Sequence, residues 1–323
     1  MSVGAVLLVC WVVLAVLDLA VAGLLALICG LSFKRCFCWG LLSLAVPVVL
    51  LAYGILIERN CYRVKTVDVE FDNLPAAFEG YTIVQLSDIH SRSFRLRTGS
   101  LQRAVEKVNA IGADLIAFTG DIVTISPDEL DATEGILGGL KARDGVVAVL
   151  GNHDYCPYIG ESKSAMSPEE GKAEVMARER RMGWRLLANE HWVLHHGGDS
   201  IAIVGVENTS TSPHFPSRGD LWGAMRGTEG MFHILLSHDP THWDSGVIGK
   251  DVPLTLSGHT HAMQFSLLGW SPIGRFYKQS EGLYRKGRQQ LYVNIGLGET
   301  IFPARIGAVP EITRLVLHRR AAQ

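Results

Sequence analysis

Two long apolar runs occupy the first sixty residues of the chain. In residues 3–31 the only charged residue is Asp18, and a second apolar run covers residues 36–57. Each run has the roughly 20 residues that a helix needs to cross about 30 Å of hydrocarbon. The first run is longer than the apolar part of a secretory signal, and no Lys or Arg precedes it. The pattern predicts a two-helix transmembrane hairpin over residues 1–60 in which Asp18 faces the other helix; a buried soluble hairpin is the alternative.

After this hairpin, short apolar runs alternate with polar segments. Strands that are buried on both faces give such continuous runs, and helical spacing of apolar residues lies between some of them, as at residues 100–111 and 169–182. No linker or repeat divides this part of the chain. The pattern predicts one α/β domain over residues 64–323. An alternating strand at 67–71 precedes the apolar runs, which are 82–86, 115–118, 146–150, 201–206, 232–236, 254–256, 291–295 and 312–317.

Charge and cysteine content narrow the function classes. The 323 residues carry a formal net charge of −2, which argues against a nucleic-acid partner held by a basic surface. Five of the six cysteines lie in the hairpin or at its edge, and Cys156 alone lies in the predicted domain. That domain therefore has no internal disulfide, which fits a reducing compartment.

The side of the membrane on which the domain lies depends on a few basic residues. Lys34 and Arg35 lie in the hairpin turn, whereas Arg59, Arg63 and Lys65 follow the second helix. Because basic residues are enriched on the cytoplasmic side of membrane proteins, the count of three against two favours a cytoplasmic domain.

Polar clusters follow five of the apolar runs directly. Taken singly, each cluster is more typical of a turn than of a site. The carboxyl ends of strands in an open α/β sheet converge on one crevice, so five clusters in this order indicate a shared site. Asp, Asn and His side chains together suit Mn, Fe or Zn. The clusters contain Asp88 and His90, then Asp121, then Asn152 with His153 and Asp154, then His238, and finally His259 and His261.

One set of motifs resembles the calcineurin-like metallophosphoesterase superfamily: Asp88-x-His90, Gly120-Asp121, Gly151-Asn152-His153-Asp154, His238 and Gly258-His259-Thr260-His261. The apolar N-terminal helices, together with Gly282-Leu-Tyr284, Leu291-Tyr-Val-Asn294 and Pro310-Glu-Ile-Thr313, resemble its bacterial membrane-tethered branch. That branch includes proteins similar to UDP-2,3-diacylglucosamine hydrolases. The resemblance implies an α/β fold, a four-layer α-β-β-α sandwich preceded by the transmembrane hairpin.

The resemblance also implies a centre of two divalent metal ions, with Mn²⁺ favoured and Fe or Zn as alternatives. Such ions bind phosphate oxygens and activate water for attack on phosphorus. One ion would be bound by Asp88, His90 and His261, and the other by Asn152, His238 and His259. Asp121 would bridge the two ions, since a carboxylate has two oxygens.

Three further side chains receive roles from the same resemblance. His153 would face the phosphate, as a proton donor to the leaving oxygen or as a charge stabiliser. Asp154 would hold the imidazole of His153 in orientation. Arg92 is a candidate contact for the substrate phosphate, although a loop arginine is more often simply solvated.

The sequence thus predicts a membrane-anchored, dinuclear metal-dependent phosphoesterase in the bacterial inner membrane, with the bilayer and a lipid-linked phosphoester as partners. UDP-2,3-diacylglucosamine, a precursor of lipid A biosynthesis, is the favoured substrate. A broad phosphodiesterase or phosphomonoesterase acting outside the membrane and a non-catalytic metal-binding scaffold are the alternatives. Two apolar loops, residues 221–225 and 267–270, are expected to line an acyl pocket, enter the membrane interface or pack at a sheet edge.

Overall fold

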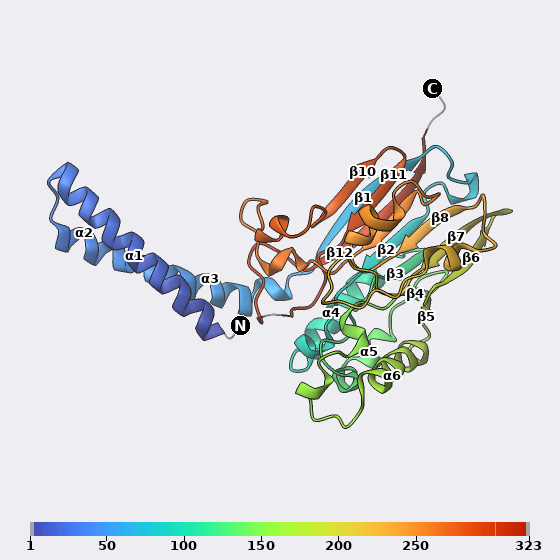
Figure 1. Cartoon of the computed structure of the whole chain (residues 1–323), viewed down its shortest axis with the longest axis horizontal. Coiled ribbons are helices and arrows are strands. Elements are labelled where there is room, and N and C mark those ends of the chain that lie inside the picture. The colour runs from blue at the N-terminus through green and yellow to red at the C-terminus, as the bar shows by residue number, and fades with distance from the viewer. Residues whose placement is uncertain (1–2, 301, 321–323) are drawn as a thin grey trace.

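The computed structural model describes residues 3–300 and 302–320, and it shows a helical hairpin that projects from a layered sandwich (Figure 1). The first helix is α1 (Val3–Cys29). The second comprises α2 (Phe33–Gly40), a 3₁₀ turn at Leu41–Leu44 and α3 (Ala45–Leu56). By length and composition, both Leu7–Cys29 and Phe33–Asn60 are able to cross a membrane.

The two helices of the hairpin contact each other through polar as well as apolar groups. Asp18 lies directly against Gly40, at a place where any Cβ would overlap its carboxylate. Asp18 therefore faces the other helix. A few residues further along, the 3₁₀ turn interrupts the second helix, and Trp11 Nε1 donates to the Leu44 carbonyl at 2.8 Å. This bond satisfies a carbonyl at the interruption, a group that would be costly to leave unpaired in apolar surroundings.

Two six-stranded mixed sheets form the centre of the sandwich. The first has the order β1 (Arg63–Phe71), β12 (Glu311–Arg319), β2 (Thr82–Leu86), β3 (Leu115–Phe118), β4 (Val146–Ala148) and β5 (Arg185–Leu186). The second has the order β10 (Gly282–Lys286), β11 (Gln289–Val293), β9 (Leu254–Ser257), β8 (Phe232–Leu236), β7 (Asp199–Gly205) and β6 (Glu190–His196).

Apolar side chains fill the space between the two sheets. Ile83 and Leu115 of the first sheet and Ile203, Ile234 and Leu256 of the second belong to one buried cluster. The outer face of the first sheet is covered by α4 (Thr98–Asn109), α5 (Glu134–Leu137) and α6 (Pro168–Arg181), and that of the second by α7 (Leu221–Met225) and neighbouring turns. The predicted α/β fold with four α-β-β-α layers is therefore confirmed.

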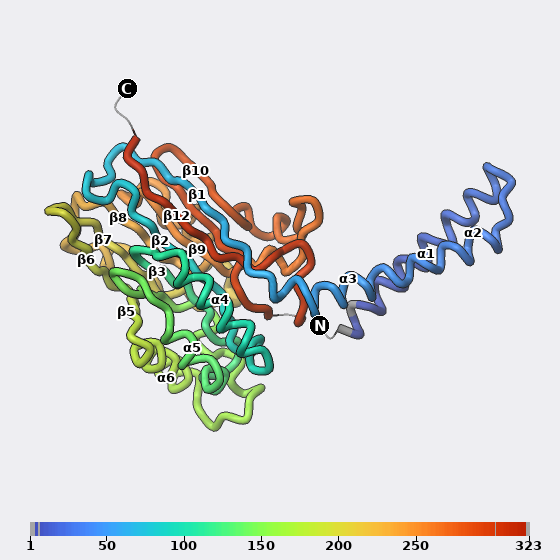
Figure 2. Tube along the Cα trace, turned by 180° about the vertical axis from the view of Figure 1, so that it is seen from behind, coloured from blue at the N-terminus to red at the C-terminus, as the bar shows by residue number. Residues whose placement is uncertain are grey.

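The end of the anchor is packed against the sandwich. Gly54 in α3 is buried, and its backbone lies against Arg305 and Ile306. Arg59 Nη1 donates to the Pro303 carbonyl at 3.0 Å, and the Asn60 side-chain oxygen accepts from Arg97 at 2.9 Å. Figure 2 shows the same arrangement from behind, with the hairpin leaving the sandwich beside the segments that contain these residues.

Candidate metal centre

The predicted ligand residues lie on loops that follow strands of both sheets. Asp88 and His90 follow β2, Asp121 follows β3, and Asn152 follows β4 in the first sheet, where these three strands run parallel. In the second sheet β8 and β9 also run parallel and precede the other three ligand residues, His238, His259 and His261. The loops meet at the carboxyl ends of the strands, as the order of motifs predicts.

Asp88, His90 and His261 converge on one point. His261 Nε2 lies 3.1 Å from Asp88 Oδ1 and 3.1 Å from His90 Nε2. All three side chains are buried, and their ligand atoms lie within 4.8 Å of one another. This spacing fits a single divalent cation.

A second cluster of Asp121, His238 and His259 lies beside the first. His238 Nε2 is 3.1 Å from Asp121 Oδ2 and 3.2 Å from His259 Nδ1. The same oxygen of Asp121 lies 3.8 Å from His90 Nε2, which belongs to the first cluster. One carboxylate is therefore within reach of both clusters, as a bridging ligand must be.

Asn152 provides an independent test of whether these residues fit a metal centre. Its side-chain oxygen is buried and has no hydrogen-bond partner among the residues that the structure describes. Leaving such an oxygen unsatisfied is costly, and a cation bound there would remove that cost. The two His/Asp clusters and this free oxygen together fit a dinuclear centre.

Backbone strain is concentrated at the same residues. Asp88 (φ 50°), His90 (φ 45°), Asp121 (φ 59°), His259 (φ 74°) and His261 (φ 50°) all adopt left-handed conformations. These conformations are unfavourable for side chains other than glycine and tend to persist where function requires them. Here they direct five side chains from three loops into a small volume.

The adjacent glycine at position 120 is required by this crowding. Gly120 has a φ of 98°, and a Cβ there would lie 2.5 Å from the Gly151 nitrogen and 2.8 Å from His238 Nδ1. Any larger residue would push apart the loops that carry Asp121 and His238. The glycine beside Asp121 thus allows the close approach of the two loops.

Both carboxylates of the site are held in the charged form. Burial acts against ionisation, but His261 beside Asp88 and His238 beside Asp121 outweigh it and lower the pKa of each carboxyl group. These two carboxylates are therefore negatively charged. Two divalent cations bound beside them would more than neutralise this pair of charges and would attract an anionic phosphate ligand.

The histidines differ in their protonation. Burial lowers the pKa of His90 and of His259, which keeps both imidazoles in the neutral form that binds metals. For His238 burial has the same tendency, but the Asp121 carboxylate outweighs it and raises the pKa to about 10. The proton on His238 therefore lies between His238 and Asp121, where a cation bound by both side chains would lie.

His153 lies beside the clusters without joining either. Its Nδ1 is 2.7 Å from the Thr124 carbonyl and therefore donates to it, while its backbone N–H donates to Asp121 Oδ1 at 2.8 Å. The imidazole packs edge-on against that of His90, with ring centroids 5.0 Å apart. With Nδ1 engaged in this way, Nε2 remains for a ligand outside the protein.

The predicted orienting role of Asp154 is wrong, because its carboxylate does not contact the His153 ring. It accepts four backbone N–H bonds instead, and the carbonyl of Thr124 is the group that holds the imidazole of His153. Asp154 thereby joins the loop that follows β3 to the loop that follows β4. Its donors are Asp121 at 2.8 Å, Ile122 at 2.9 Å, Val123 at 3.2 Å and Gly151 at 2.8 Å.

Several groups that orient the histidines were not predicted from the sequence. His238 Nδ1 donates to the Thr119 carbonyl at 2.7 Å. His259 Nε2 hydrogen-bonds the Tyr277 hydroxyl at 2.7 Å, and the buried Arg305 donates to His261 Nδ1 at 3.2 Å. Such outer contacts fix which nitrogen faces a metal. Tyr277 and Arg305 lie outside the motifs, so no spacing in the sequence indicates them.

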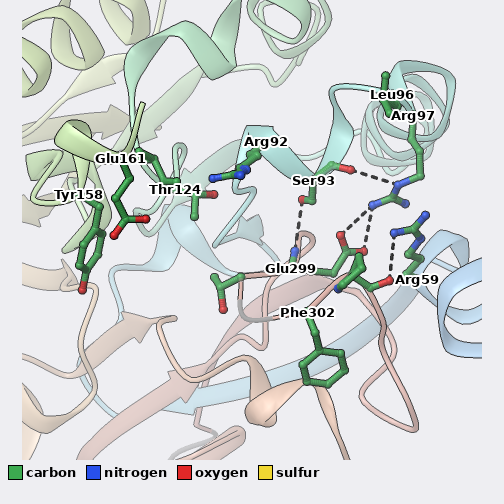
Figure 3. Close-up of a pocket in the computed structure, with 13 residues that line it drawn as sticks. Arg59, Arg92, Ser93, Leu96, Arg97, Thr124, Tyr158, Glu161, Glu299 and Phe302 are labelled. Carbon is green, nitrogen blue, oxygen red and sulfur yellow. Dashed lines mark hydrogen bonds and ion pairs between the residues drawn. The ribbon is translucent and has the colours of Figure 1, made fainter. Parts of the chain in front are cut away.

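A cavity of about 730 Å³ extends from the rim of this site to the end of the anchor. Arg92, Thr124 and Tyr158 line it on the side of His153, and Arg59 and Phe302 line it on the side of the hairpin (Figure 3). Among the described residues, the guanidinium of Arg92 has no hydrogen bond or ion pair, and Figure 3 shows it pointing toward Thr124 and Glu161.

Comparison with known proteins agrees with this geometry. An uncharacterized metallophosphoesterase of Bacillus subtilis, YkuE, is 33% identical over 278 residues, covering 82% of this chain and 88% of that protein. A transmembrane protein with a metallophosphoesterase domain from Danio rerio is 32% identical over 288 residues, covering 85% of this chain and 62% of that protein. A UDP-2,3-diacylglucosamine pyrophosphatase of Chlamydia trachomatis, LpxG, is 25% identical over 306 residues, covering 79% and 89%.

The family match covers more than half of the chain. The sequence profile of the calcineurin-like phosphoesterases matches residues 81–263, a range that contains every residue of the two metal clusters. The chain therefore belongs to the calcineurin-like phosphoesterase family and is a metallophosphoesterase with a site for two metal ions.

Proposed function

We propose that the protein hydrolyses an amphiphilic, membrane-embedded phosphoester or pyrophosphate, and that UDP-2,3-diacylglucosamine is the favoured substrate. The cavity between the anchor and the metal site carries this proposal. Its walls combine the guanidinium of Arg92 with apolar side chains such as Leu96 and Phe302, which suits a molecule with both a phosphate and acyl chains. The similarity to LpxG, which bears the name of such a pyrophosphatase, supports the same substrate.

The roles of the metal-binding residues belong to this proposal. When bound, the two divalent ions supply positive charge to the phosphate and activate water; Mn²⁺ is the favoured metal, with Fe or Zn as alternatives. Asp121 is shared between the ions. The first ion is held by Asp88, His90 and His261, and the second by Asn152, His238 and His259.

His153 is the proposed proton donor to the leaving oxygen. The Thr124 carbonyl fixes its Nδ1–H, and the ring has its other nitrogen available toward the substrate. Arg92 is the proposed contact for a substrate phosphate, because its unpaired guanidinium lies in the cavity wall. A pyrophosphate has a second anionic group, which gives such an arginine a partner beyond the metal ions.

The proposed location is the bacterial inner membrane with the sandwich on the cytoplasmic side. The hairpin places the beginning of α1 and the sandwich on the same side (Figures 1 and 2), and Arg59, Arg63 and Lys65 lie on that side. Basic residues near the ends of membrane spans favour the cytoplasmic face. The six cysteines are all free, which also fits a reducing compartment.

The experiment is hydrolysis by the purified full-length protein in lipid nanodiscs with Mn²⁺. UDP-2,3-diacylglucosamine, bis(p-nitrophenyl) phosphate and p-nitrophenyl phosphate are compared, and products are identified by mass spectrometry. The proposal predicts UMP and a lipid monophosphate. Cleavage of the chromogenic esters without cleavage of the lipid would support the broad-specificity alternative. Two bound metal ions without turnover of any ester would support the scaffold alternative.

A further inference from the structure

We propose that the hairpin turn at residues 267–270, together with Phe276, inserts into the surface of the bilayer that the anchor crosses, so that the sandwich is docked on the membrane rather than suspended from it. This inference concerns how the domain is held at the membrane. It does not depend on the identity of the substrate.

The turn presents apolar side chains to solvent, with Leu267 61% exposed, Leu268 100% and Trp270 59%, and Phe276 further along the same segment is 73% exposed. Isolated apolar side chains on a protein surface are ordinary, but three large ones on one turn mark an interaction surface. The second apolar loop predicted from the sequence, residues 221–225, differs from this turn. Leu221 and Ala224 are buried in the core beside the second sheet, and Trp222 is its one strongly exposed large apolar side chain.

The turn is held rigid in an unfavourable conformation. The backbones of Leu267 and Trp270 exchange two hydrogen bonds of 2.8 and 3.0 Å. The residues between them, Leu268 (φ 52°) and Gly269 (φ 82°), are both left-handed. Such two-residue turns favour Asn-Gly, so Leu268 at the tip is disfavoured both by its backbone conformation and by its full exposure to water. Insertion of the tip into lipid removes the second of these costs.

The position of the turn identifies the bilayer as its partner. Ser266 N donates to the Ile306 carbonyl at 2.8 Å, and the neighbouring Arg305 N donates to the Gly54 carbonyl of α3 at 3.4 Å. Only the irregular segment that contains Arg305 and Ile306 therefore lies between the turn and the apolar helix. Figures 1 and 2 both show the segment around residues 265–280 beside α3, on the side from which the hairpin leaves.

The length of the anchor places the membrane surface at this level. The 23 residues of Leu7–Cys29 span roughly 35 Å at 1.5 Å per residue, slightly more than about 30 Å of hydrocarbon. The near surface of the bilayer thus falls at the first turns of α1 and the last turns of α3. There Leu56 (71% exposed) and Ile57 (53% exposed) are apolar residues on the surface at the end of α3.

The flanking residues suit the interface between lipid and water. Trp is favoured at the level of the lipid headgroups, and cations near the surface are attracted to anionic lipids. Arg275 and Lys278 are exposed beside Phe276, and neither has an ion pair among the described residues. The same segment continues to Tyr277, whose hydroxyl contacts His259 of the metal site, so docking would present the metal site and its cavity to the membrane.

The test uses the full-length chain at one copy per nanodisc with anionic lipid, and a nitroxide at residue 268 (Leu268→Cys). Cys156 is buried and is left in place, whereas the other five cysteines are replaced by serine. The matched control is a nitroxide at residue 222 (Trp222→Cys), because Trp222 is 67% exposed on a helix that covers the second sheet. Collision rates with dissolved oxygen, which enters lipid, and with a nickel chelate, which stays in water, are measured.

Docking predicts that oxygen reaches residue 268 more readily than the nickel chelate does, at a depth of about 5–10 Å in the interface, and that residue 222 shows the reverse. In a second variant, Leu268→Glu should return a nitroxide at residue 276 to water, and Trp222→Glu should not. Retained metal content shows that each variant is folded. Equal nickel access at 268 and 222 would overturn the proposal. So would protection of 268 that occurs only when two copies share a disc, which would identify a second copy as the partner. Neither readout requires a substrate.

Discussion

The carboxylate of Asp154 offers a prediction in which the sequence-based and the structural roles lead to different results. In the Asp154→Asn variant one oxygen becomes an amide NH₂ group, which cannot accept hydrogen bonds. Oδ1 accepts from Ile122 and Val123, and Oδ2 accepts from Asp121 and Gly151. Whichever oxygen is replaced, two buried backbone donors lose their acceptor and face another donor.

The expected cost follows from these two lost bonds. Burial, followed by the nearby Asp121 carboxylate, raises the pKa of Asp154 to about 7, so the carboxylate is charged above that pH. A hydrogen bond to a charged acceptor contributes about 1.5–3 kcal/mol, so losing two there costs roughly 3–6 kcal/mol of folding free energy. At about 2–4 °C per kcal/mol for a domain of this size, the apparent melting temperature should fall by roughly 6–24 °C. Because the donors adjoin Asp121 and Asn152, we expect weaker metal retention as well.

Thermal melting of the full-length protein measures the loss of stability, and its metal content measures the loss of metal retention. The rates of hydrolysis of two phosphoesters complete the assay. The control is Asp131→Asn, since the Asp131 side chain is 67% exposed and pairs with Arg178 on the surface. Such a pair contributes about 0–1 kcal/mol, so this variant should melt and bind metal as the native chain does. An Asp154→Asn protein that keeps its melting temperature and both metals, and merely turns over more slowly, would exclude the role of Asp154 in joining the two loops.

Three further predictions concern the site and the anchor. Asp121→Asn should reduce the metal content below two ions per chain and lower turnover by at least ~10²-fold, because one shared charge is lost; full activity at unchanged metal content would exclude a bridging role. His153→Ala should keep both metals and lower turnover by ~10²–10⁴-fold. The loss should be larger for alkyl esters than for p-nitrophenyl esters, whose leaving oxygen needs no proton. Equal losses for both kinds of ester would favour charge stabilisation over proton donation as the role of His153. Deleting residues 1–50 should give a soluble domain that hydrolyses small esters. Deleting residues 1–60 should give a domain that melts at a lower temperature, because Asn60 then no longer accepts the hydrogen bond of 2.9 Å from Arg97. If the protein that lacks residues 1–50 were folded but inactive, the helices would be part of the catalytic unit.

Most of the fold was predictable because the central strands are buried on both faces. Such strands give continuous apolar runs, and all of those predicted are strands in the structure. The strands without a prediction are β5, β6 and β10, which lie at or near sheet edges. Their polar residues, such as Arg285 and Lys286 of β10, face solvent, so these strands lack the continuous apolar run that identifies the central strands.

The convergence of the ligands was predictable for a related reason. Each predicted ligand follows a buried strand, so topology alone brings Asp88, Asp121 and His238 to one edge. The groups that orient them were not predictable in this way. Arg305 lies in an irregular segment far along the chain, and its contact with His261 depends on how that segment folds back. Asp154 was misassigned because adjacency in sequence to His153 says nothing about which donors surround a carboxylate.

The contacts at the junction show that the anchor and the metal site are parts of one packed unit. Arg305 donates through its backbone to Gly54 of α3 and through its guanidinium to His261. Arg97 links Asn60 at 2.9 Å to both carboxylate oxygens of Glu299 at 3.0 and 2.9 Å. A flexible tether would need neither set of bonds. Because these bonds join the last turn of the hairpin to the loops beside the first metal cluster, the orientation of the hairpin also sets the orientation of the metal site.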